Sequence, residues 1–137
     1  MGLSKLIWSV LADNIQIGNG NTMTGMQKIA RRHGISCLQR LSIHAEVSDS
    51  LTQSNIVILL TKTLSNMCCS KDKDTGTIRF TTALLLNIIV AMIRTGNQLN
   101  AKNEICDLAE CLCKLFIFKT VNKTSLIHLI ILFSYFV

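Results

Sequence analysis

The sequence predicts an all-α protein, chiefly because of two apolar segments joined by a short polar stretch. Ile56 to Cys69 and Phe80 to Ile93 carry more hydrophobic residues than one face of an amphipathic helix needs. Residues 70–77 between them are polar, and the chain contains no proline that would interrupt a helix. Helices that are apolar most of the way round must be covered on several sides. We therefore expect them to lie inside a stack of antiparallel helices.

Length and composition favour one small domain with an unusually apolar surface. The chain has 137 residues, of which 49% are hydrophobic and 16% are charged. This length suits a single core, and we expect one helical domain over residues 1–123 followed by an apolar tail over residues 124–137. So few charges leave hydrophobic surface to be covered, which predicts a binding partner or further repeats.

The first helix is expected near the amino terminus. Leu3 to Ala12 has apolar residues at helical spacing, including Leu6, with Trp8 at the edge of the apolar face. The glycine- and asparagine-rich residues 14–24 then predict a loop.

Two more short helices are expected before the apolar pair. One begins with Thr22 or Thr24 as the N-cap and ends at Gly34, a suitable C′ residue. The next covers Ile35 to Val47. The three side chains of residues 48–50, Ser-Asp-Ser, are of the kind that caps helix N-termini, so they should precede the first of the two apolar helices.

The remaining helices follow from apolar spacing and from residues that stop helices. Thr75 or Thr77 should cap the second apolar helix, which continues to Arg94 before Gly96 stops it. A further helix from Asn100 carries apolar residues at helical spacing. The continuous apolar faces predict a core of seven residues: Ile56, Leu60, Leu64, Leu85, Ile89, Leu108 and Leu112.

These helices resemble those of helical-repeat proteins. Residues 58–69, ILLTKTLSNMCC, and residues 83–90, ALLLNIIV, are similar to the inner helices of armadillo repeats. The resemblance covers Leu51 to Thr120 and lacks the glycine that usually sets the turn after the first short helix of that repeat. A HEAT-type repeat and an irregular helical bundle stay open as alternatives. The resemblance implies a fragment of a solenoid. Such a fragment is expected if this chain is a shortened form of a larger solenoid protein.

We expect a non-enzymatic scaffold that binds a protein partner. Stacked helices form a groove lined by the inner helices, and Asn66 and Asn87 lie near or within these apolar helices. A side-chain amide can both donate to and accept from an extended peptide backbone. The alternative interpretation is that each asparagine satisfies a neighbouring carbonyl of its own chain.

A basic cluster offers a second kind of partner. Residues 26–40 contain no acidic residue, and the formal net charge of the whole chain is +6. Such a cluster could contact the phosphate backbone of a nucleic acid, although no aromatic residue lies there to stack on bases. Its members are Lys28, Arg31, Arg32 and Arg40.

Neither a metal site nor a catalytic site is expected. On one helix, Cys111 lies ~140° from Cys106, so these two and Cys113 cannot converge on one ion. The three histidines have no nucleophile or acid at a spacing that would bring it beside them. Because no signal peptide is recognised, all six cysteines should be free, buried thiols in an intracellular protein, cytoplasmic or nuclear, without cofactors.

The tail supplies the third hypothesis, a membrane-associated protein. Residues 124–137 are almost continuously apolar. As a helix they would reach ~21 Å, short of a hydrocarbon core of ~30 Å, and Lys119 and Lys123 prevent extension backwards. The tail should therefore insert shallowly or pack onto the core. Its deletion should leave the helices of residues 51–120 intact and raise soluble yield.

Overall fold

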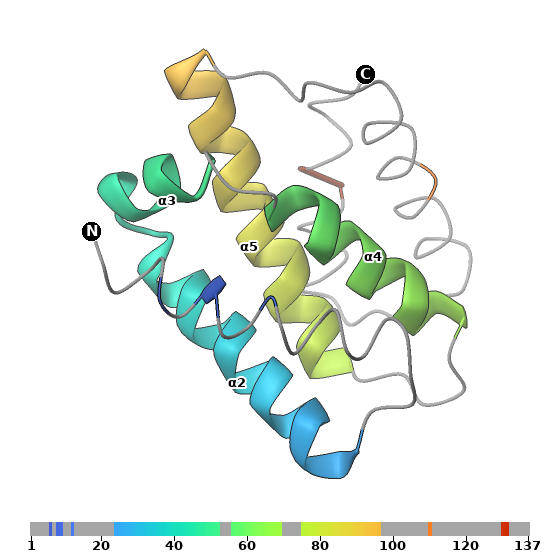
Figure 1. The fold of residues 1–137 in the computed structure, drawn as a ribbon. Coiled ribbons are helices and arrows are strands. Elements are labelled where there is room, and N and C mark those ends of the chain that lie inside the picture. The colour runs from blue at the N-terminus through green and yellow to red at the C-terminus, as the bar shows by residue number, and fades with distance from the viewer. Residues whose placement is uncertain are drawn as a thin grey trace.

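One long helix, α5 (Thr75–Thr95), runs through the middle of the fold and contacts the other three described helices (Figure 1). These are α2 (Gly25–Leu41), α3 (Ala45–Leu51) and α4 (Ile56–Cys69). The structure, a computed structural model, describes residues 6, 8, 9, 12, 24–52, 56–69, 75–96, 110, 130 and 131. None of these residues is in a strand. The all-α prediction is confirmed.

The carboxyl-terminal end of α5 follows from its sequence. Its carboxyl end is set by Gly96, which has a positive φ of 76° and donates from its backbone nitrogen to the Ile93 carbonyl at 3.3 Å. Glycine adopts this left-handed conformation without the steric cost that a Cβ brings. The predicted stop at Gly96 is confirmed.

The buried threonines of α4 and α5 form hydrogen bonds within their own helices. The Oγ1 atoms of Thr61, Thr63 and Thr81 each donate to the backbone carbonyl four residues earlier, at 2.7, 2.9 and 2.7 Å. A hydroxyl satisfied by its own helix carries little desolvation penalty. Polar residues can therefore occupy the packed sides of both helices.

The amino-terminal end of α2 is closed by a reciprocal cap. Gln27 donates from its backbone nitrogen to Thr24 Oγ1 at 3.2 Å, and Thr24 donates from its backbone nitrogen to Gln27 Oε1 at 2.9 Å. This capping box satisfies two donors that have no partner within a helix. Of the two predicted N-caps, Thr24 is the one used.

The predicted break at Gly34 is wrong, because α2 continues through it to Leu41. A glycine inside a helix costs about 1 kcal/mol relative to alanine. The buried side chains of Arg31, Ile35 and Leu38 flank Gly34 at helical spacing. Packing of this face outweighs the cost.

The turn instead lies at residues 42–44, and α3 follows it from Ala45. The predicted helix over Ile35 to Val47 is therefore divided between α2 and α3. Residues 48–50 do not cap α4 either, since they lie inside α3. The Ser48 hydroxyl donates back to the Ala45 carbonyl at 3.2 Å, so it serves its own helix.

The core agrees with the sequence prediction wherever the structure describes it. Leu60, Leu64 and Leu85 are fully buried, as is Ile56, and Ile89 is 5% exposed. Leu108 and Leu112 lie outside the described residues, as does most of the helix predicted from Asn100. Five predicted core positions are thus confirmed on two adjacent helices.

Near the amino terminus the apolar face differs from the prediction. Leu6, Trp8, Ser9 and Ala12 are helical. Trp8 belongs to the core and is 7% exposed, whereas Leu6 is 62% exposed. The predicted face, with Leu6 inside and Trp8 at the edge, is therefore wrong for these two residues. The larger ring removes more apolar surface from water when it is buried.

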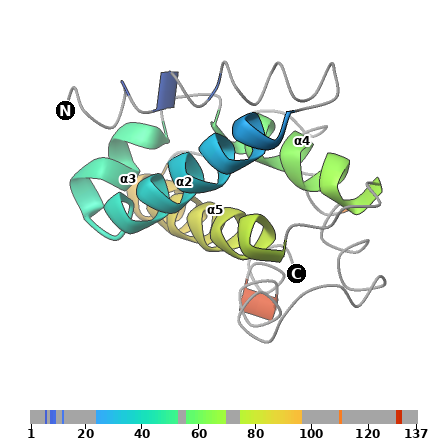
Figure 2. The same ribbon diagram turned by 90° about the horizontal axis from the view of Figure 1, so that it is seen from below.

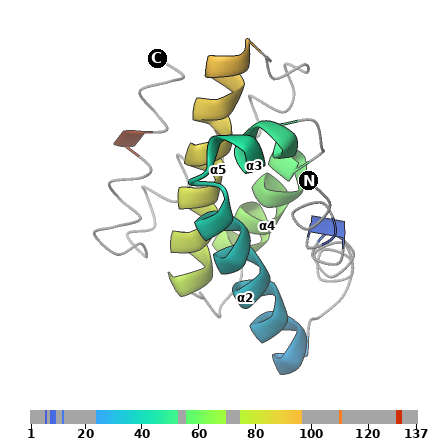
Figure 3. The same cartoon turned by 90° about the vertical axis from the view of Figure 1, so that its left-hand side faces the viewer.

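α2 and α5 lie side by side and run in the same direction (Figures 2 and 3). Three pairs fix this register: the Arg32 guanidinium against Gly76, Ser42 with Asn87, and Asp49 of α3 with Arg94. The residue numbers of both partners increase together from the first pair to the third, which is the order expected for parallel helices. A parallel pair of helices does not occur between sequence neighbours joined by a short turn, so α3 and α4 together form the connection.

Candidate functional site

An open groove lies where the turn after α2 and the start of α3 meet one side of α5. Its volume is about 310 Å³, and it faces solvent rather than enclosing a cavity. An open, shallow shape suits a peptide or a protein surface better than a small molecule, which needs to be largely enclosed. The lining residues are Ser42, Ile43, Ser48, Leu86, Asn87, Val90, Arg94 and Ile131.

Asn87 lies in this groove and already holds one internal partner. Its Nδ2 atom donates to Ser42 Oγ at 2.8 Å, and Ser42 Oγ in turn donates to the Gln39 carbonyl at 2.7 Å. The chain of two hydrogen bonds ties α5 to the end of α2. Asn87 Oδ1 accepts no hydrogen bond within the described part of the chain. The side chain therefore has a structural role and keeps acceptor capacity facing the groove.

Apolar side chains flank the amide. Ile43 is 70% exposed and Val90 is 36% exposed. Both lie beside Asn87 in the same groove. Large exposed apolar side chains around a polar group are typical of surfaces that bind other proteins.

The tail reaches this groove through one described residue. Ile131 lines the groove with Leu86 and Val90 of α5, while its neighbour Ile130 is 55% exposed. Ile131 is itself 37% exposed.

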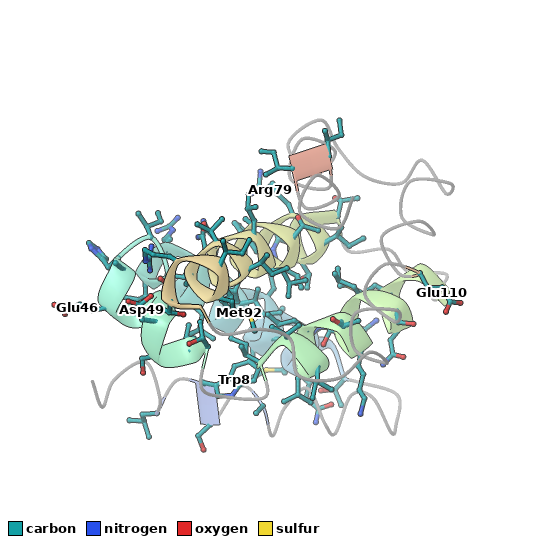
Figure 4. All side chains as sticks on the ribbon, turned by 90° about the horizontal axis from the view of Figure 1, so that it is seen from above. Trp8, Glu46, Asp49, Arg79, Met92 and Glu110 are labelled. Carbon is teal, nitrogen blue, oxygen red and sulfur yellow. The ribbon has the colours of Figure 1, made fainter. Side chains whose placement is uncertain are left out.

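Arg94, which lines the groove, forms an ion pair. The Arg94 guanidinium donates to Asp49 Oδ1, and both side chains are partly exposed. Glu46 of the same short helix projects outward, whereas Met92 points among the helices (Figure 4). The pair neutralises the cation at the groove and links α3 to α5.

Asn66, the second predicted partner-binding residue, does not line this groove. It lies on the exposed side of α4, one turn after the exposed Lys62. The structure thus does not bring the two asparagines together in one site. Of the predicted pair, only Asn87 lies in the groove.

The predicted basic patch is divided by the packing of α2. Arg31 is 8% exposed on the packed side, whereas Arg32 and Arg40 are exposed and Lys28 is half-buried. Arg31 recurs with Ile35 and Leu38 at helical spacing, which explains its burial. Placing Arg31 in a surface cluster was therefore wrong, and nucleic-acid binding stays a prediction for the others.

The cysteines depart from the prediction at one position. Cys37 is a free thiol, as expected, but it is exposed rather than buried, because it faces away from α5 on α2. Cys106, Cys111 and Cys113 lie outside the described residues. Within the described part of the chain, no three His, Cys, Asp or Glu side chains are grouped as metal ligands.

Most residues of the groove were not singled out from the sequence. Ser42, Ile43 and Arg94 come from two segments about 45 positions apart, brought together by the parallel register of α2 and α5. Spacing within one helix carries no information on such a register.

α5 has the length and apolar composition of a membrane-spanning helix. Its mean hydropathy over the most apolar window is 1.7, and 61% of that window is buried in the fold. The central helix of a helical domain has the same properties, so this is weak evidence for a span.

Comparison of the chain with protein-family models, with curated proteins and with solved structures finds no match.

Proposed function

We propose that this protein is a non-enzymatic helical interaction module that binds an extended peptide of a partner protein in the groove on α5. The observation that carries the proposal is the grouping of exposed Ile43 and Val90 around the Asn87 amide. The amide can accept from a peptide N–H while the flanking side chains bind an apolar residue of the peptide. The armadillo- or HEAT-type solenoid predicted from the sequence belongs to this proposal, because such folds bind peptides along their inner helices.

A display selection with natural peptide sequences against the intact, immobilised chain tests the proposal. The decisive comparison is between two substitutions on α5, Val90→Glu in the groove and Ile93→Glu outside it. Both side chains are exposed, and Ile93 does not line the groove. A glutamate at position 90 also lies four residues before Arg94, a spacing that supports the helix.

We expect selected peptides to lose affinity about tenfold on Val90→Glu and to keep it on Ile93→Glu. Asn87→Ala should weaken the same peptides. Equal effects of the two glutamates, or no selected peptide that depends on position 90, would reject the groove as the binding site.

Ile131, which lines the groove, provides a second arm of the experiment. If the tail covers part of the groove, Ile131→Ser should raise the affinity of a selected peptide, whereas Ile130→Ser should not. The two isoleucines are neighbours, but only Ile131 lines the groove among the described residues. A peptide that competes with the tail should bind more tightly once the contact is weakened.

A further inference from the structure

The outward side of α2 carries two large apolar residues that are exposed and that no other described part of the chain covers. Met26 is 81% exposed and Ile29 is 59% exposed. They are three positions apart, so they lie on the same side of the helix. The opposite side packs against α5 through Ile35 and Leu38. α2 therefore presents apolar side chains to solvent as well as to the core.

The same outward side carries a cation and no acidic residue. Arg40 is exposed on it, as is His33, and α2 contains no acidic residue at all. With 100° between successive residues, Ile29, His33, Arg40 and Met26 fall within a stripe about 60° wide and ~21 Å long. Arg32 lies outside this stripe, and its guanidinium packs beside Gly76 at the start of α5. Along the stripe the two apolar residues come first, and His33 and Arg40 follow them.

We propose that this face of α2 binds the surface of a bilayer that contains anionic phospholipids. In this arrangement the helix lies in the plane of the interface. Met26 and Ile29 enter the boundary between headgroups and acyl chains, while Arg40 contacts lipid phosphates.

Two features favour lipid over nucleic acid as the anionic partner. The most exposed side chain of the face is Met26, which has no interaction to offer a phosphate. Aromatic residues that could stack on bases are absent from α2. A bilayer surface uses both the apolar and the cationic groups.

Co-sedimentation of the full chain with lipid vesicles tests the proposal. Vesicles of phosphatidylcholine mixed with phosphatidylserine should bind the protein, and vesicles of phosphatidylcholine alone should bind it much less. Added sodium chloride should weaken binding, because Arg40 acts through screened charge. Arg40→Gln should lower the partition coefficient about fivefold.

Matched variants separate this face from the rest of the surface. Ile29→Ser should lower binding, whereas Ile93→Ser, at a side chain of similar exposure on α5, should not. Lys62→Gln on the exposed side of α4 serves as the control for Arg40→Gln. All these side chains are exposed, and circular dichroism should show an unchanged helical spectrum.

Four results would overturn the proposal. Equal binding to both kinds of vesicle would remove the role of anionic lipid, and absence of binding to either would remove the membrane. Loss of binding on Ile130→Ser but not on Ile29→Ser would assign it to the tail. Tight binding of an RNA oligonucleotide that depends on Arg40 and not on Ile29, with no binding to vesicles, would assign the face to nucleic acid.

Discussion

α2 and α5 are neighbours of similar length that run in the same direction, but they bury their surfaces in different ways. α5 buries eleven of its 21 residues against three other helices. α2 buries a narrow stripe that contains Arg31, Ile35 and Leu38. The difference indicates that α5 organises the fold, while most of α2 is available for surface chemistry.

The largest expected effect is a charge on the packed side of α5. Ile89→Asp should abolish the cooperative thermal transition, because an unpaired carboxylate would be enclosed at a position that is 5% exposed. We expect a loss of more than about 4 kcal/mol. Ile93→Asp, on the exposed side of the same helix, should melt close to the parent protein. Similar melting of both variants would show that α5 is not the central helix.

A smaller effect is expected within α2. Ile35→Ala should lower the free energy of unfolding by about 2–4 kcal/mol, because it leaves a cavity at a fully buried position. Ile29→Ala should change it by less than about 0.5 kcal/mol. Urea titrations followed by circular dichroism measure both values. If Ile29→Ala were the more damaging change, the assignment of the two faces of α2 would be reversed.

The hydrogen bond between the helices should contribute less again. A double-mutant cycle of Ser42→Ala and Asn87→Ala should give a coupling energy of about 0.5–1.5 kcal/mol, since the Nδ2 to Oγ distance is 2.8 Å. The same unfolding titrations supply the four free energies. Strict additivity would mean that the parallel register does not bring the two side chains together.

The smallest effect is expected from the ion pair between Asp49 and Arg94. Both side chains are more than a third exposed, at 40% and 47%, so solvent screens their attraction. Asp49→Asn should cost about 0.2–1 kcal/mol at low salt, and the difference should vanish in concentrated sodium chloride. A loss that persists at high salt would indicate that Asp49 stabilises α3 in another way.

The sequence is most informative where a strong apolar run meets a residue with special backbone freedom. The end of α5 at Gly96 follows from these features, and the apolar run Ile56 to Cys69 coincides with α4. The same rule fails at Gly34. A glycine ends a helix only where packing of the following residues does not stabilise a longer helix. The burial of Arg31 was open to prediction, since it shares its helical spacing with Ile35.

The candidate site was less predictable than the fold. Asn87 stands out as a polar residue in an apolar helix, and it does lie in the groove. Its partner Ser42 does not stand out, because serine is common in turns. The pairing depends on how two distant segments align, and a single sequence holds no local pattern for that alignment.

The constant offset between partners on α2, α3 and α5 has a consequence for the rate of folding. Both side-chain links join residues 45 positions apart, Ser42 to Asn87 and Asp49 to Arg94. Only residues 70–74 separate α4 from α5, so their contact closes a short loop. Closing the longer loop costs more chain entropy, and non-local contacts slow folding. We expect α4 and α5 to associate first, and the docking of α2 to limit the rate at which the native protein forms.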